Sequence, residues 1–505
     1  MRYFQLIACS LLVSQNLCAE DITVQNATAQ IDQMISARWQ TENVQPAQQS
    51  DDAEFCRRIW LDLAGVAPPV SAIRSFLKDS SDKKREKLIQ QILNSPEHAN
   101  HMASVWTKIL VPSTTNDGRQ NTAALTKWLR SKFNRNLPYD YLVAGFLTAG
   151  GSGDTGPTVF YTSNDLDPKK LAAATSRIFM GIQLQCAECH DHPFDRWTQE
   201  DFWSYAAFFS QLARSNNGNN GEAIIEDRLG GEVMLPDTDQ TMAPKYPGID
   251  EVPEADPGNR RRRQLTIWMA SRDNPYLARA AVNRVWGQLM GRGFVDPVDA
   301  MDANNVPSHP ELLDALAKFL VQQRFDLRKL YAAIVASKTY QLSSKYTGER
   351  PYEELFAVQN VKTLSADQIY LTLQQNIVRQ TSNTNAFSRQ QFLLRMESSE
   401  TSSLEYPHGV VQVLGMMNGP EILQASRSDT GLLASLEAPF FDDATRIETL
   451  YLATVSRKPT ETERNRCAKF ISQGETVADR RAAISDTLWA LLNTCLLYTS
   501  PSPRD

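Results

Sequence analysis

The chain has 505 residues, of which 42% are hydrophobic and 22% are charged, and its formal net charge is −6. This composition is typical of globular proteins, and the length favours two or three domains at roughly 100–200 residues each. The negative charge gives no support to a nucleic-acid partner, because nucleic-acid-binding domains present a basic surface. We interpret the basic run from Arg260 to Arg263 as a solvated helix start or as an interdomain contact with an anion.

Residues 1–19 have the features of a secretory signal peptide. Arg2 precedes an apolar stretch from Phe4 to Val13, and the small Ala19 stands before an acidic pair, so we expect cleavage after Ala19. No later apolar run approaches the roughly 20 residues that a membrane-spanning helix needs. The sequence therefore predicts an extracytoplasmic protein, periplasmic or secreted, with no membrane span after signal cleavage.

The last residues, CLLYTSPSPRD at 495–505, read like a translated sequencing adapter. We predict that they are foreign to the fold, that they pack poorly, and that the natural chain continues past Thr494. Without this segment and the signal peptide, four cysteines remain: Cys56, Cys186, Cys189 and Cys467. For Cys56 and Cys467 two outcomes stay open: a disulfide, which an oxidising compartment permits, or two buried free thiols.

Residues 28–212 are predicted to form a helical domain. Asp167 followed by Pro168 is typical of a helix start, because aspartate caps the first amides and proline suits the first turn. Apolar residues at helical spacing continue through KKLAAATSRIFMGIQLQCAECH. We expect one helix that runs to the end of this segment and stops before Pro193. Its last turn then brings together three side chains, those of Cys186, Cys189 and His190.

Residues 213–258 are predicted to be a loop-rich connector. The run NNGNNG at 216–221 indicates a flexible linker. Gly230 and Gly231 stand between apolar segments and favour the turn of a small β-hairpin. Proline-rich coil follows to the end of the connector.

Residues 259–494 are predicted to form a second helical domain. Ser308 with Glu311, and Thr460 with Glu463, match the capping-box pattern of helix starts. The expected fold class is therefore mainly α, with two helical domains joined by a loop-rich connector that contains a small β-hairpin.

The stretch LQCAECHDHPFDRW at 184–197 contains the pattern C-x-x-C-H, formed by Cys186, Cys189 and His190. This pattern attaches c-type haem covalently, and the same residue types also form zinc corners and redox disulfides. A zinc site would want a second ligand pair, whereas Cys56 and Cys467 are isolated. A redox C-x-x-C belongs in a βαβ setting. Covalent haem c is therefore the favoured cofactor.

Other histidines are candidates for supporting or ligating the iron. His190 is the expected proximal ligand, and His192 is tethered too closely to it to reach the opposite haem face. We expect His192 to support the site together with Asp191 or Asp195. His309 is the candidate distal ligand, because a helix start keeps its ring neutral; a plain helix-start histidine is the alternative. A surface helix start is expected for His98 and His101, a loop for His408, and the core for Met416 and Met417.

Seven aromatic residues follow the motif within the sixteen positions from 194 to 209. Such a stripe is typical of a helix that packs its core face. It also suits the low-dielectric wall that tunes the potential of a haem. The two interpretations are compatible.

A resemblance to the planctomycete-type cytochrome c-like domain family rests on ATSRIFMGIQLQCAECHDHPFDRWTQEDFWSYAAFF, and upstream on IDQMISARW, RRIWLDLAGVAPP and LPYDYLVAGFLTAGG. Two further stretches resemble the companion domain that usually follows this one: NPYLARAAVNRVWGQLMGRGFVDPVDAMDANNVPSHPELLDALAKFLV and ETLYLATVSRKPTETER. The C-terminal end expected for that companion domain is missing here. Both families are largely domains of unknown function. The resemblance implies a secreted, haem-bearing, mostly α-helical protein, and it supplies no reaction.

These observations predict a c-type haem protein that transfers electrons or oxidises an extracellular substrate. The general association of the family makes a polysaccharide the expected substrate class, and the sequence does not identify the redox partner protein. The alternative is a secreted binding protein without enzymatic activity, in which C-x-x-C-H is a zinc or structural corner. A hydrolase is disfavoured, because the chain contains neither G-x-S-x-G nor H-E-x-x-H.

Overall fold

The computed structural model describes residues 23–111, 122–152, 156–215, 224–249, 258, 260–379, 386–396, 410–427, 431–494 and 499–500. The expected signal peptide and the whole NNGNNG run lie outside the described residues. Helices dominate the described part, and the expected mainly α fold class is confirmed. No helix within the described ranges combines the length and the apolar character needed to cross a bilayer.

The N-terminal region is built of short and medium helices. Its α-helices are α1 (Val24–Thr41), α2 (Asp52–Ala64), α3 (Val70–Lys78), α4 (Lys84–Leu93), α5 (Pro96–Leu110), α6 (Thr122–Asn134), α7 (Tyr139–Leu147), α8 (Thr158–Ser163), α9 (Pro168–Thr175) and α10 (Gln199–Ala206). Three tighter or wider turns accompany them: the π-helical η1 (Ser176–Met180) and the 3₁₀-helical η2 (Leu184–Glu188) and η3 (Ala207–Phe209).

The C-terminal region is helical as well. Its α-helices are α11 (Arg261–Met269), α12 (Leu277–Met290), α13 (Pro310–Gln322), α14 (Leu327–Ala336), α15 (Ala366–Thr372), α16 (Ala386–Met396), α17 (Val410–Asn418), α18 (Pro420–Ala425), α19 (Gly431–Leu436), α20 (Asp443–Thr454), α21 (Glu461–Ser472) and α22 (Val477–Leu492). The 3₁₀-helical η5 (Glu353–Leu355) and the π-helical η6 (Leu373–Val378) complete the region.

The expected small hairpin is present, but its turn was placed wrongly. Strands β2 (Leu212–Ser215) and β3 (Ile224–Asp227) pair antiparallel, and β1 (Gly151–Ser152) adds to the other side of β3. The hairpin connection is therefore 216–223, and Gly230-Gly231 lies after β3 instead of between two strands. Gly231 has a φ of 128° and packs so closely on Ser210 that a side chain there would meet backbone atoms. Gly231 thus allows close packing on Ser210, whereas Gly230 has no atom within 4 Å of an added Cβ.

Helix starts follow the local capping chemistry in most of the predicted places. Asp167 caps α9 by accepting from the Lys169 amide, with Pro168 in the first turn. Thr460 and Glu463 form the expected capping box of α21. The box expected at Ser308 is wrong, because the structure makes His309 the N-cap residue of α13 without a side-chain cap bond.

The basic run at the start of α11 is a contact between regions. The Arg262 guanidinium is buried, pairs with Asp227 of β3 at 2.6 Å, and donates to the Ala149 carbonyl at 2.7 Å. Arg261 pairs with Glu232 of the connector at 2.8 Å. The interpretation as an interdomain contact with an anion therefore holds for these two arginines, and the solvated helix start does not.

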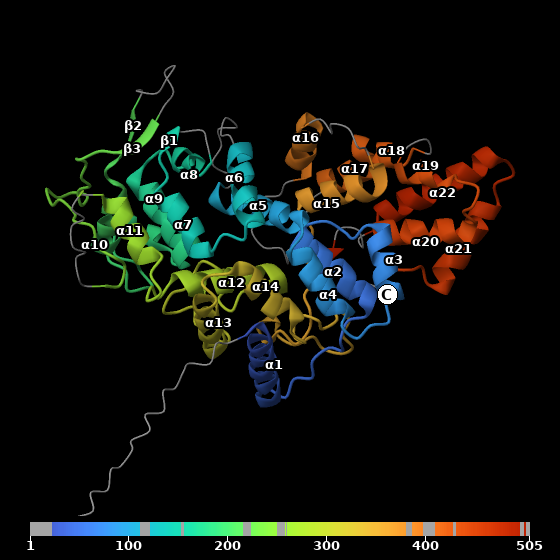
Figure 1. Ribbon diagram of the computed structural model, residues 1–505, viewed down its shortest axis with the longest axis horizontal. Helices are drawn as coiled ribbons and strands as arrows, with labels where there is room; N and C mark the ends of the chain where they lie inside the picture. The colour runs from blue at the N-terminus through green and yellow to red at the C-terminus, as the bar shows by residue number, and fades with distance from the viewer. Residues whose placement is uncertain are drawn as a thin grey trace, which may run out of the picture.

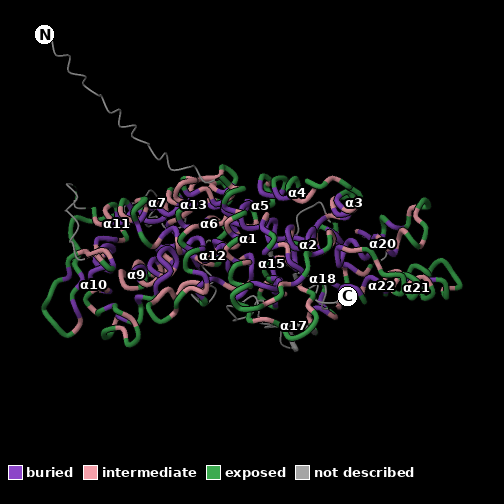
Figure 2. The backbone as a smooth tube through the Cα atoms, turned by 90° about the horizontal axis from the view of Figure 1, so that it is seen from below, coloured by how far each residue is buried: buried purple, intermediate pink, exposed green. Residues whose placement is uncertain are grey.

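The two helical regions share one hydrophobic core. Its members run from Ala27 in α1 to Leu492 in α22, and Figure 2 shows buried backbone along the whole length of the molecule. In Figure 1, helices α2–α4 lie between the α6–α11 part on one side and the α20–α22 part on the other. Helix α1 packs on α13 and α14, and α3 packs on α20. Helices α2–α4 thus lie at the centre of the fold.

The segment interpreted as a translated adapter makes one regular contact. Residues Thr499–Ser500 form β5, which pairs antiparallel with β4 (Lys362–Thr363). The expectation of poor packing is therefore wrong for these two residues. The rest of 495–505 lies outside the described residues.

Candidate functional site

The helix that was expected to carry the C-x-x-C-H motif ends before it. Helix α9 continues as the π-helical η1 and stops at Gly181, whose φ is 71°. A side chain at Gly181 would stand 3.3 Å from the Ala280 Cβ and the Met301 Sδ, so glycine suits both the left-handed backbone and the close contact. The prediction of one continuous helix to His190 is wrong. The motif lies on the separate turn η2.

The short turn η2 presents both motif cysteines to solvent. Leu184 and Ala187 are buried and anchor the turn, whereas Cys186 and Cys189 are exposed free thiols. Positions three apart share one side of a 3₁₀ turn, which has three residues per turn. The structure therefore places the two thiols on the accessible side of an anchored turn.

His190 follows the turn as an exposed side chain. Its Nδ1 lies 2.7 Å from the carbonyl oxygen of Asp191. A carbonyl oxygen only accepts hydrogen bonds, so Nδ1 is the donor in this contact, and the neutral tautomer that makes it has its lone pair on Nε2. A histidine that ligates a metal through Nε2 is commonly oriented by such a bond.

The backbone of the motif is held by residues of α10 and its first turn. Gln199 Nε2 donates to the carbonyls of Glu188 (3.2 Å) and Cys189 (2.9 Å), and Trp203 Nε1 donates to Glu188 at 3.0 Å. The amide of Gln199 donates to the Asp191 carboxylate at 2.9 Å. The sequence analysis missed Gln199 and Trp203 as positioning residues. The signal was the start of α10, where Thr198 and Asp201 form a capping box.

His192 supports the loop after the motif through a different partner from the ones expected. Its Nδ1 accepts from the Phe194 amide at 3.2 Å, and its own amide donates to the Trp197 carbonyl at 2.8 Å. The carboxylate of Asp195 accepts from the Arg196 amide instead. His192 therefore closes a turn whose ends are five residues apart in sequence.

Most aromatic residues of the flank belong to the core. Phe202, Tyr205, Phe208 and Phe209 are fully buried. Tyr205 packs edge-to-face on Phe208 and Phe209, with centroids 6.1 and 6.0 Å apart, and Phe202 packs edge-to-face on Trp203. Phe194 differs, because it is 75% exposed beside the motif. The core interpretation is correct for the buried rings. Of the four buried rings and Phe194, Phe194 alone offers an apolar surface to solvent.

The candidate distal ligand His309 is buried among residues that do not belong to the motif loop. It is 6% exposed, and its ring lies between Phe294 and Phe356 at centroid distances of 6.1 and 5.6 Å. Burial lowers its pKa to about 4. Its Nδ1 lies 3.1 Å from the Ser308 hydroxyl, and its Nε2 is buried without a hydrogen-bond partner. The described contacts of His309 involve no residue of the motif loop.

The remaining candidates are structural. His98 is buried, with Nδ1 2.8 Å from the Leu63 carbonyl, and His101 packs directly against Gly65. The expected surface position is therefore wrong for His98, whereas His101 is partly exposed. Met416 is buried, in agreement with a core role, and His408 lies outside the described residues.

The other two cysteines are not paired with each other. Cys56 is fully buried and Cys467 is half-buried, and both are free thiols. The Cys467 Sγ lies 3.9 Å from the Tyr451 hydroxyl. Burial raises the pKa of both thiols. Of the two outcomes left open, the structure has free thiols. Within the described ranges, no group of three or more histidine, cysteine, aspartate or glutamate side chains is arranged to hold a metal ion.

Comparison with protein families matches two stretches of the chain. Residues 30–214 match the PSCyt2 family, described as a protein of unknown function (DUF1549). Residues 261–406 match the PSD1 family, also described as a protein of unknown function (DUF1553). The pair and its order are those expected from the sequence. No curated protein and no solved structure matches the chain.

Proposed function

We propose that the chain, which matches the PSCyt2 and PSD1 families over residues 30–214 and 261–406, is an extracytoplasmic c-type haem protein that transfers electrons or oxidises an extracellular substrate. The observation that carries the proposal is the state of the C-x-x-C-H motif. Both thiols are free and exposed on one anchored turn, and the adjacent imidazole keeps its Nε2 available.

The residues present fit a covalently bound haem. Cys186 and Cys189 would hold the porphyrin through thioether bonds, and His190 would be its proximal ligand. A haem supplies one-electron redox chemistry at its iron. Hydrogen bonds from Gln199 and Trp203 fix the backbone of the turn. The protein therefore brings two nucleophilic sulfurs and one oriented imidazole to a single surface.

The position of the motif favours exchange of electrons with another protein. The side chains of Cys186, Cys189 and His190 are all exposed, so a cofactor attached there is close to the molecular surface. Solvent exposure is one of the factors that set the potential of a redox centre. We propose a separate redox partner protein that docks over this surface. For a catalytic role, a polysaccharide that the protein oxidises stays the expected substrate class.

Haem staining on a denaturing gel tests the proposal. The protein is produced with its signal segment in cells that contain the c-type maturation machinery. We expect the wild-type band to stain for haem peroxidase activity and the Cys186→Ala/Cys189→Ala variant to lose the stain. Cys467→Ala is the matched control, because this half-buried thiol lies outside the motif, and it is expected to stain like the wild type.

Two outcomes contradict the proposal. Staining that persists in the double cysteine variant would show attachment elsewhere or none through the motif. If the wild-type protein stays unstained while a reference cytochrome c stains in the same cells, the protein carries no covalent haem and the proposal is refuted. Stoichiometric zinc in elemental analysis of that protein would then favour a binding protein with a zinc corner.

A further inference from the structure

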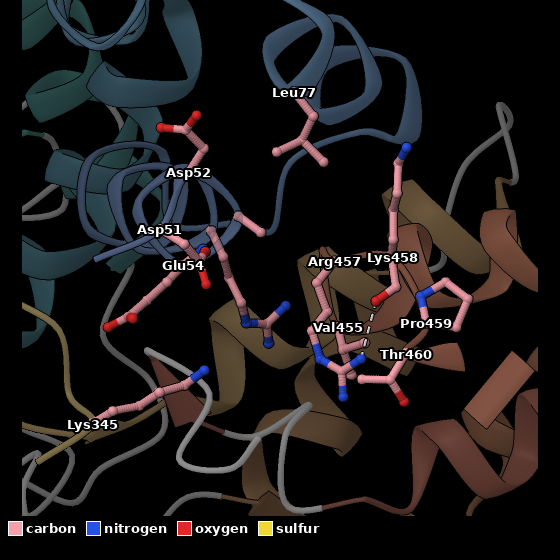
Figure 3. A pocket seen from close by; sticks show the side chains of 12 residues that line it. Asp51, Asp52, Glu54, Leu77, Lys345, Val455, Arg457, Lys458, Pro459 and Thr460 are labelled. Carbon is pink, nitrogen blue, oxygen red and sulfur yellow. Dashed lines mark hydrogen bonds between the residues drawn. The ribbon is translucent and has the colours of Figure 1, made fainter. Parts of the chain in front are cut away.

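The polar pocket in Figure 3 is a junction between the N-terminal and C-terminal regions. Its walls are the first turn of α2, Lys345, and the turn between α20 and α21. The Arg457 guanidinium is bound by the Glu463 carboxylate at 2.7 and 2.9 Å, and Asp52 pairs with Lys84 at 2.5 Å. These charged groups bind other protein groups, so this junction is structural.

A second junction between the two regions lies directly after the C-x-x-C-H motif, at residues 191–197, named here the 191–197 loop. The His192 amide joins its ends by donating to the Trp197 carbonyl at 2.8 Å. The Asp191 carboxylate accepts from the Gln199 amide at 2.9 Å. The Asp191 carbonyl lies 2.7 Å from the His190 Nδ1. The position of the loop therefore affects the orientation of the motif imidazole.

The side chain of Asn304, in the stretch that matches PSD1, binds the middle of this loop. Its Nδ2 donates to the Phe194 carbonyl. The segment that carries Asn304 is itself anchored. The Asp302 carboxylate accepts from the Asn304 amide at 2.8 Å, and the Met301 amide donates to the Gly181 carbonyl at 2.8 Å. Asn304 therefore offers its donor from a fixed support.

Tyr276 holds the 191–197 loop at a second point. It is the N-cap residue of α12. Its hydroxyl accepts from the Arg196 Nη2 at 3.3 Å and donates to the Pro247 carbonyl at 3.1 Å. The Arg196 guanidinium also lies over the Trp197 ring, 4.6 Å from the ring centroid. One hydroxyl thus joins the second helical region, the connector and the 191–197 loop.

We propose that Tyr276 and Asn304 are positioning residues of the C-x-x-C-H site. From the PSD1 stretch they hold the 191–197 loop, and through the loop they hold His190 in the orientation that the site needs. The inference rests on the proposed function, in which His190 is the proximal ligand of a covalently bound haem. It also gives the pairing of the two family stretches in one chain a physical reason, because side chains of the second complete the site of the first.

Hydrogen–deuterium exchange followed by mass spectrometry tests the proposal on the full chain produced without haem. Tyr276→Phe/Asn304→Ala removes the hydroxyl and the amide donor and leaves the aromatic ring in place. Each hydrogen bond contributes modestly to local stability, so we expect the peptide that covers the 191–197 loop to exchange about tenfold faster. Peptides from α2 and α20 are expected to exchange at the wild-type rate. Asn304→Gln keeps an amide donor, and its loop is expected to exchange more slowly than that of Asn304→Ala.

The reduction potential of the haem-bearing chain is the readout that a purely structural role would not change. A looser loop admits water to the site, and solvent exposure is one of the factors that set the potential of a haem. Water stabilises the more highly charged oxidised iron, so we expect a lower potential in Tyr276→Phe/Asn304→Ala. Asn94→Ala is the matched control, because Asn94 is an exposed asparagine whose amide donates to the Gln90 carbonyl at the end of α4. It is expected to have the wild-type potential.

The proposal is overturned if the loop peptide of the double variant exchanges at the wild-type rate. It is also overturned if all peptides accelerate equally, since the two side chains would then act on the whole fold, or if the double variant and Asn94→Ala have the same reduction potential. A chain that takes up no haem refutes the proposed function alone, because the exchange measurement still decides whether Tyr276 and Asn304 hold the loop.

Discussion

The buried pair of Asp62 and Lys362 joins the first helices of the chain to its C-terminal region. The Asp62 carboxylate lies 2.6 Å from the Lys362 Nζ and accepts from the Tyr340 hydroxyl at 2.8 Å. The two side chains are 6% and 7% exposed. Lys362 also donates to the carbonyls of Gln288 and Leu289 at 3.1 and 2.9 Å. The ammonium group is therefore fully bonded only while Asp62 is present.

We expect Asp62→Ala to reduce the free energy of unfolding by about 3–5 kcal/mol, the usual cost of leaving one partner of a buried ion pair unpaired. Burial lowers the pKa of Lys362, and Asp62 opposes that shift. The double variant Asp62→Leu/Lys362→Met removes both charges and fills the space, so it is expected to recover most of the loss. Recovery stays incomplete, because the Tyr340 hydroxyl loses its acceptor.

Urea denaturation followed by tryptophan fluorescence measures these changes. Glu42→Ala is the control, because its ion pair with Arg38 is 41% and 48% exposed and such pairs contribute about 0–1 kcal/mol. A loss in Asp62→Ala no larger than in Glu42→Ala would refute the reasoning. A double variant as unstable as the single one would show that lost hydrogen bonds, and not the unpaired charge, cause the effect.

Two further predictions concern the contact between α2 and α5. Burial lowers the pKa of His98 to about 4 from an ordinary 6.5, so the unfolded chain binds a proton that the folded chain refuses between these pH values. The free energy of unfolding is therefore expected to be highest above pH 6.5 and to fall by about 3 kcal/mol toward pH 4. Denaturation at a series of pH values measures this fall. The prediction is contradicted if His98→Gln loses the same amount over this pH range. Gly65→Ala is expected to lower the melting temperature clearly, because Gly65 has a φ of 68° and an added Cβ would stand 2.2 Å from the His101 Nδ1; an unchanged melting temperature contradicts this.

The sequence predicted those features that are encoded within a few neighbouring residues. The helix start at Asp167-Pro168 and the capping box of Thr460 and Glu463 are confirmed, because their hydrogen bonds join residues two or three positions apart. The mainly α fold class follows from the same local patterns. The C-x-x-C-H motif is local as well, and its spacing alone identified the thiols that the structure exposes.

Features that depend on residues far apart in the chain could not be predicted from the sequence. The helix after Pro168 stops at Gly181, which has a left-handed backbone and lies close to Ala280 and Met301 of the other region. Gly230-Gly231 resembles a hairpin turn, yet β3 pairs backward with β2 and β1. His98 at a helix start has the pattern of a surface residue, and contact with the Leu63 carbonyl and Tyr331 buries it.

The two cysteines of the C-x-x-C-H motif are exposed, whereas the isolated Cys56 is buried. Cys56 is fully buried, and burial raises the pKa of its thiol, so it is both inaccessible and a poor nucleophile. Cys186 and Cys189 lie at the surface on a turn whose neighbouring carbonyls are fixed by Gln199 and Trp203. A covalent attachment site needs reactive groups on a rigid support. The backbone of the motif loop is anchored to helix α10 while its two thiols face solvent, which is the arrangement that the proposed haem attachment requires.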